Sequence, residues 1–129
     1  MQKCGDEVLY SASDLVGYLE CEHLTTLDLI NLVTPLPKTE DDDQAKLIQA
    51  KGFAHEADFL ELLRARHATL IDISATDRSL TQKVEATLQA MRDGYEIIFQ
   101  ATLQDGCLIG HADFLRKVPR PSSLGDWSY

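Results

Sequence analysis

The chain has 129 residues, of which 44% are hydrophobic, and it carries 12 Lys and Arg against 21 Asp and Glu, a formal net charge of −9. This length suits one domain with a real core, and the composition is that of a soluble globular protein and excludes a disordered one. No apolar run approaches the roughly 20 residues that cross a membrane, and MQKCGDEVLY lacks the apolar stretch of a secretory signal. An odd number of cysteines, three, makes a reducing cytoplasm the expected location.

The first part of the chain is predicted to be mainly helical. Residues 1–10 are expected to form a short strand or an irregular lead-in, and residues 11–33 a helix. Ser11 or Ser13 can cap this helix, with Asp14 near the positive end of its dipole. Two prolines and an acidic run then predict a loop over residues 34–43.

A second helix is predicted from residue 42 or 43 to about residue 67. Five of its positions recur at helical spacing, which places them on one face: Ile48, Gly52, His55, Phe59 and Leu62. His55 is therefore expected to point with the apolar side chains and not into bulk water. Gly52 lowers helix stability by about 1 kcal/mol relative to alanine, and its position one turn before an inward histidine can admit a close backbone approach.

The rest of the chain is predicted to alternate between strands and a helix. We expect a strand over residues 68–74, a helix over residues 79–94 that ends at Gly94, and strands over residues 95–103 and 107–118. The QDG segment between the last two strands is a strong hairpin signal. Residues 119–129 are predicted to be a loop. This order indicates an α+β or α/β fold with a small sheet that is incomplete at its C-terminal edge.

Asp113 is a lone carboxylate inside the apolar segment GHADFL, residues 110–115. Because a buried and unpaired charge costs free energy, Asp113 must be exposed, paired or bound to something. Arg116 and Lys117 could pair with it. Side chains alternate along a strand, so His111 and Asp113 are expected on the same face, together with Cys107 and Ile109.

Four segments follow one another along the chain: SASDLVGYLECEHLTTLDL, GFAHEADFLELL, IFQATLQDGCLIGHADFLRKV and PSSLGDWSY. Together they resemble the N-terminal half of RecB-type nucleases, which belong to the PD-(D/E)xK superfamily. The resemblance covers nearly the whole chain. It implies a single, partial domain over residues 1–129 with an incomplete restriction-endonuclease-like core, in which helices flank a small mixed sheet. It also implies Mg²⁺- or Mn²⁺-dependent hydrolysis of DNA.

The resemblance assigns roles to individual residues. In that family a helix histidine in a G-x-x-H setting helps to hold a divalent metal, and here this is His55. A strand aspartate in a G-x-x-D setting is the first acidic metal ligand, and here this is Asp113. The resemblance thus implies that both residues are catalytic and metal-binding. Glu56, which also fits a helix-surface charge, and His111, which also fits a mere neighbour of Asp113, are further candidates.

A basic group follows the strand of Asp113 and consists of Arg116, Lys117 and Arg120. It could contact a DNA backbone near the metal, or it could be a solvated strand end. The net charge of −9 does not exclude DNA, because a bound cation neutralises the carboxylates of a metal-dependent nuclease.

In the family, the next strand carries an acidic residue, one intervening residue and a lysine that helps to activate the attacking water. No such motif follows Asp113 before Tyr129. A shortened chain, a split gene or a degenerate remnant would each explain this. We therefore expect weak Mg²⁺ or Mn²⁺ binding and no activity from these residues alone. The alternative is a non-catalytic module that serves as a binding or scaffolding domain for a helicase or another DNA-processing partner.

Two further expectations concern cysteines and self-association. Cys4, Cys21 and Cys107 are widely spaced and form no CxxC, which argues against disulfides and a zinc site. Some relatives bind an iron–sulfur cluster through a cysteine after the first helix and three C-terminal cysteines, but this chain has no such trio, so no cluster is expected. An unpaired sheet edge beside the strand at 107–115 predicts self-association.

Overall fold

The computed structural model describes residues 1–37, 39, 42–74 and 78–129. The described residues form four helices and two small sheets, which confirms the predicted α+β class. Contacts divide the chain into two compact units, residues 1–40 with 104–110 and residues 41–103 with 111–129. None of the described helices combines the length and apolarity of a membrane span.

The first unit begins with a strand pair. Strand β1 (Gln2–Cys4) pairs antiparallel with β2 (Glu7–Leu9) in a register that places Gln2 opposite Leu9. Gly5 lies in the tight connection with a φ of +61°, a conformation that glycine adopts without steric cost. The lead-in is therefore a small hairpin.

Two helices replace the single helix predicted over residues 11–33, so that prediction was wrong. Helix α1 (Ala12–Glu20) and helix α2 (Glu22–Asn31) are separated at Cys21, which has extended dihedral angles of φ −159° and ψ 103°. A Cβ added at Gly17 would lie 3.3 Å from the Leu24 side chain, so the glycine lets α2 pack closely against α1. Ser11 caps α1 as predicted, and Asp14 completes the capping box.

Helix α3 (Asp43–Arg66) matches the second predicted helix. The Asp42 side chain accepts a hydrogen bond from the backbone N–H of Ala45 at 2.7 Å and caps the helix. The predicted buried face is wrong by one position. Leu60 and Leu63 are the buried residues of α3, whereas the predicted positions Ile48, Phe59 and Leu62 are 63%, 41% and 41% exposed.

A three-stranded sheet contains the strands predicted in the second half of the chain. Strands β3 (Leu70–Asp72), β4 (Ile97–Asp105) and β5 (Leu108–Arg116) lie in the order β3-β4-β5. Strand β3 is parallel to β4, and their register ends with Asp72 opposite Phe99. The predicted hairpin between β4 and β5 is confirmed. Strand β5 is the edge of this sheet, and Tyr10 forms a single parallel bridge to its first residue, Leu108.

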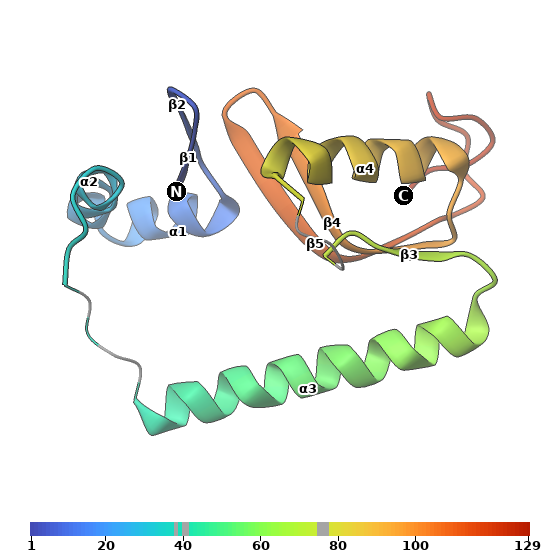
Figure 1. The fold of residues 1–129 in the computed structure, drawn as a ribbon, viewed down its shortest axis with the longest axis horizontal. Helices are drawn as coiled ribbons and strands as arrows, with labels where there is room; N and C mark the ends of the chain where they lie inside the picture. Colours follow the sequence, from blue (N-terminus) through green and yellow to red (C-terminus); the bar gives the residue numbers. More distant parts are fainter. Residues whose placement is uncertain (38, 40–41, 75–77) are drawn as a thin grey trace. The chain divides into compact units, whose positions relative to one another are not determined.

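Helix α4 (Leu80–Asp93) lies against the sheet (Figure 1). It begins with a capping box formed by Ser79 and Gln82 and ends at Gly94, which has a left-handed φ of 72°, as predicted. Its apolar side packs into a fully buried cluster in which it meets β4 and the residue after β3. The cluster consists of Ile73, Ala90, Ile98 and Ala101.

Two buried threonines join α4 to β4. The Thr87 hydroxyl accepts a hydrogen bond from the backbone N–H of Thr102 at 2.9 Å and donates to the backbone carbonyl of Lys83 at 2.9 Å. Thr87 and Thr102 are 0% and 1% exposed. Thr87 therefore satisfies a backbone group of the sheet that water does not reach.

The C-terminal loop is held against the end of α4 by Trp127. Its indole N–H donates to the Met91 carbonyl at 3.0 Å, and the Lys117 ammonium lies 4.5 Å from the ring centroid. A Cβ on Gly125 would lie 2.9 Å from the indole, so only glycine admits this packing. The Tyr129 hydroxyl donates to the Tyr95 carbonyl at 2.6 Å, and burial raises the pKa of Tyr129.

Candidate functional site

The structure brings His55 and Asp113 to one cavity of about 450 Å³ in the second unit. Helix α3 supplies one wall and strand β5 the other. The cavity is lined by Gln49, Gly52, Phe53, His55, Glu56, Phe59, Asp113 and Phe114. Three chemical groups that bind cations, one imidazole and two carboxylates, thus face the same space.

Aromatic rings form the apolar part of this cavity and join α3 to the sheet. The rings of Phe59 and Phe114 meet edge to face, with centroids 5.0 Å apart and an interplanar angle of 86°. Phe99 of β4 lies 5.0 Å from Phe114 on the same side. Asp113 and Phe114 are neighbours in β5, and both line the cavity.

Two expectations about α3 need correction. His55 is exposed, because the buried stripe of the helix follows Leu60 and Leu63. Its imidazole therefore borders the cavity and also meets solvent. A Cβ added at Gly52 would have nothing within 4 Å, so this glycine serves no close backbone approach.

Gln100 is the residue of this site that the sequence interpretation missed. Its side-chain nitrogen donates hydrogen bonds to Glu56 Oε1 and to Asp113 Oδ1, the latter at 3.3 Å. Its backbone has a φ of 52°, and it is the only non-glycine residue with positive φ in the part of the chain that the structure describes. The available signal is its position as the only amide side chain in the mostly apolar run IIFQATL.

The remaining candidates lie outside this cavity. His111 Nδ1 is 3.4 Å from the Thr102 hydroxyl, and His111 is absent from the cavity lining. Lys117 donates to the Gly94 carbonyl at 3.2 Å in addition to its contact with Trp127, so its ammonium is engaged within the fold. Arg116 and Arg120 are exposed.

A second hollow of about 440 Å³ contains part of the basic group. Its lining combines charges of both signs with one indole: His67, Glu96, Arg116, Lys117, Val118, Pro119, Asp126 and Trp127. Glu96 accepts a hydrogen bond from the backbone N–H of Ala68 at 2.8 Å and lies 3.4 Å from His67 Nδ1. The bond from Ala68 is the main cause that lowers the pKa of Glu96.

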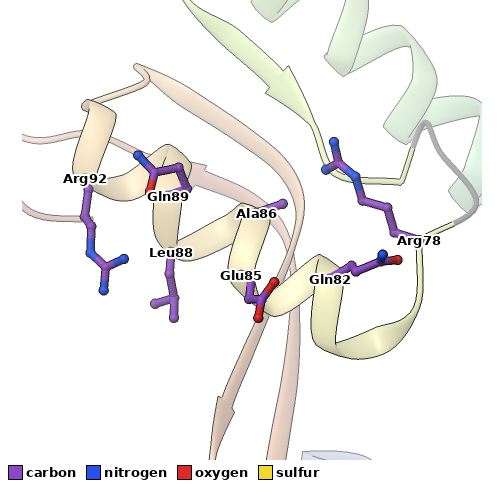
Figure 2. Close-up of a pocket in the computed structure, with 7 residues that line it drawn as sticks. All are labelled: Arg78, Gln82, Glu85, Ala86, Leu88, Gln89 and Arg92. Atoms are coloured by element: carbon purple, nitrogen blue, oxygen red, sulfur yellow. The ribbon is translucent and has the colours of Figure 1, made fainter.

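A third hollow of about 570 Å³ lies along the exposed side of α4 (Figure 2). Arg78 and Arg92 occupy its two ends, and Figure 2 shows their guanidinium groups pointing in different directions. The two cations therefore do not converge on one ligand.

The described part of the chain holds no ready-made metal centre. Residues 1–37, 39, 42–74 and 78–129 contain no group of three or more His, Cys, Asp or Glu side chains arranged to hold a metal ion. The three cysteines are free thiols; Cys4 is half-buried, and Cys21 and Cys107 are exposed. The cavity lined by His55 and Asp113 therefore offers an incomplete set of ligands.

Comparisons with known protein families, with curated proteins and with solved structures find no match to this chain. The resemblance to RecB-type nucleases rests on the four sequence segments.

Proposed function

We propose that the cavity between α3 and β5 binds a divalent cation and that the chain is the N-terminal part of a RecB-like, metal-dependent DNA nuclease with a PD-(D/E)xK core. The observation that carries this proposal is the cavity itself. His55 and Asp113 come from two separate elements, and both line it. A shared cavity is what a common cation requires of them.

The donor chemistry fits a hard divalent ion. Mg²⁺ prefers carboxylate oxygen, and Mn²⁺ also accepts imidazole nitrogen. Asp113 and Glu56 supply carboxylates, and the exposed His55 supplies an imidazole. Because these side chains do not form a complete ligand group among the described residues, binding is weak and most coordination positions belong to water.

A bound Mg²⁺ or Mn²⁺ ion polarises a phosphate and lowers the pKa of a coordinated water. In this proposal, Asp113 of the sheet and His55 of the helix bind the cation and fix its position. His55 and Asp113 are both exposed, so water reaches the cavity and would complete the coordination of a bound ion. No D-x-K or E-x-K motif follows Asp113 in this sequence, so cleavage requires groups beyond those that these residues supply.

DNA contacts are assigned to the exposed members of the basic group. Arg116 and Arg120 are free to reach phosphates, whereas Lys117 is engaged with Gly94 and Trp127. Each arginine that neutralises a phosphate increases the salt dependence of binding. Self-association through the edge strand β5 remains a further prediction, because an exposed edge can pair with another chain.

The proposal is tested by Mn²⁺ titration of the ¹⁵N-labelled chain, with paramagnetic broadening of backbone signals as the readout. We expect broadening centred on His55, Glu56 and Asp113. The Asp113→Asn variant should lose it, and His55→Ala should weaken it. Asp105→Asn, an exposed aspartate at the far end of β4, is the matched control and should behave as the wild type. Unchanged broadening in Asp113→Asn would refute the proposal.

The same titration separates the nuclease from the alternative, a non-catalytic module for a helicase or another DNA-processing partner. That alternative predicts no specific cation binding at the cavity and no effect of Asp113→Asn. A nuclease assay with Mn²⁺ on single- and double-stranded DNA complements the titration. We expect no cleavage by these 129 residues alone.

A further inference from the structure

The backbone of β4 adopts an unfavourable conformation at one point, Gln100. Its φ of 52° belongs to the left-handed region, which residues other than glycine, asparagine and aspartate rarely adopt. The parallel register of β3 with β4 ends at the preceding residue, Phe99. Strained residues of this kind persist only where the surrounding structure holds them, and they cluster at functional sites.

The Gln100 side chain lies beside two carboxylates of the cavity. Its amide nitrogen carries two protons, and one nitrogen donates to both Glu56 and Asp113. Ionised carboxylates are acceptors only, so this orientation of the amide is the one that satisfies both partners. A single amide therefore links a carboxylate of α3 to a carboxylate of β5.

This link has an electrostatic purpose. Two carboxylates that face one space repel each other, and the two amide protons offset part of that repulsion. Loss of a group that hydrogen-bonds to a ligating carboxylate typically lowers metal affinity by about 10- to 100-fold. A residue that draws Glu56 toward Asp113 would thus prepare both for the same cation.

We propose that Gln100 is a positioning residue of the cation site, and that it makes Glu56 a second carboxylate of that site by holding it beside Asp113. This inference rests on the proposed function, since it presupposes cation binding at the cavity. It differs from a purely structural role, in which the amide would only fasten α3 to the sheet.

Four variants distinguish the two roles by their Mn²⁺ dissociation constants and their urea unfolding without metal. In Gln100→Asn the new residue tolerates positive φ, but its side chain is one methylene shorter, so the amide no longer reaches both carboxylates. We expect it to weaken Mn²⁺ binding about tenfold, which is the size of effect known for residues that orient ligands. Glu56→Gln should weaken binding similarly. The double variant should be little weaker than either single variant, because Gln100 acts through Glu56. Asp113→Asn is the reference for loss of a ligand.

A fifth variant, Gln100→Glu, guards against misfolding of Gln100→Asn. It retains the length of the side chain but replaces the donor with a third carboxylate. We expect a lower unfolding midpoint without metal and a larger Mn²⁺-induced increase of that midpoint than in the wild type. Gln44→Glu, which adds the same charge at an exposed position of α3, should show the wild-type increase.

The outcomes separate the inference from the function beneath it. If Asp113→Asn weakens Mn²⁺ binding while both Gln100 variants bind and respond to Mn²⁺ like the wild type, the role of Gln100 is structural and this inference is overturned. If Asp113→Asn also leaves Mn²⁺ binding unchanged, the proposed cation site itself fails.

Discussion

The two faces of the β3-β4-β5 sheet in the second unit differ in how they are covered. On the α4 face, Ile98 and Ala101 are 0% exposed and pack with Ala90. On the α3 face, aromatic contacts leave a cavity lined by charged side chains, and Phe53 is 70% exposed. One face is closed and apolar, and the other is open and carries the candidate site.

Gln100 interrupts the alternation of side chains along β4. Ile98 and Ala101 are three positions apart and would lie on opposite faces of a regular strand, yet both belong to the α4 cluster. The left-handed Gln100 between them shifts the alternation, as an extra residue does in a β-bulge. Thr87 then satisfies the N–H of Thr102. A hydroxyl of α4 thus satisfies a backbone N–H of β4 close to the irregular residue.

The largest expected effect is a loss of stability when the packing of the closed face is disturbed. Ile98→Ala should lower the free energy of unfolding by roughly 3 kcal/mol, because it removes buried methyl groups and leaves a cavity. Urea unfolding followed by circular dichroism measures this. Phe53→Ala on the open face is the control and should change stability by no more than about 0.5 kcal/mol. Equal losses in the two variants would mean that the faces do not differ in packing.

Thr87→Val removes the hydroxyl that accepts a hydrogen bond from the backbone N–H of Thr102. This variant keeps the shape of the side chain but leaves the buried N–H of Thr102 without an acceptor, which should cost about 2 kcal/mol of unfolding free energy. Thr81→Val, at an exposed position of the same helix, is the matched control. Faster hydrogen exchange at Thr102 in Thr87→Val would locate the effect, and wild-type exchange there would contradict it.

Two glycines should respond with opposite signs. Gly94→Ala forces a side chain into a left-handed residue with φ 72° beside Lys117 and Trp127, and should cost about 1 kcal/mol. Gly52→Ala adds a methyl group to the interior of α3 where nothing lies within 4 Å, and should gain up to about 1 kcal/mol. Thermal unfolding of both variants tests this. Lower thermal stability of Gly52→Ala would show that a methyl group at this position does meet neighbouring atoms.

The smallest effect is a pH dependence of the contact between Ala68, which follows α3, and Glu96, which precedes β4. The N–H of Ala68 lowers the pKa of Glu96 in the folded protein. A lowered carboxyl pKa contributes stability above the ordinary value of about 4.3 and loses it as the pH falls through the folded value. Stability of the wild type should therefore fall more steeply than that of Glu96→Gln between about pH 5 and pH 3. Parallel curves would contradict this.

Local signals were sufficient for most element boundaries. Ser79, Gly94 and the Asp-Gly turn act on the residues beside them, so the limits of α4 and of the hairpin follow from the sequence. The break at Cys21 does not, because the leucine spacing continues across it. The approach of Leu24 of α2 to Gly17 of α1 is visible only in three dimensions.

The candidate site was predictable in part for the same reason. Asp113 is conspicuous as a charge in an apolar strand, and the cavity does contain it together with His55. The buried residues of α3 are Leu60 and Leu63, and helical periodicity alone did not distinguish this stripe from the neighbouring one. Gln100 is neutral, and no pattern of neighbouring residue types reveals a left-handed backbone within a strand.

Trp127 is the only tryptophan of the chain, and its position determines what intrinsic fluorescence can report. The indole is fixed to Met91 and covered by the Lys117 ammonium, so its emission changes when the C-terminal segment separates from the end of α4. The walls of the cavity contain phenylalanine instead, which tryptophan excitation does not detect. A fluorescence melting curve would therefore follow one side of the sheet, and opening of the other side could proceed without an optical signal.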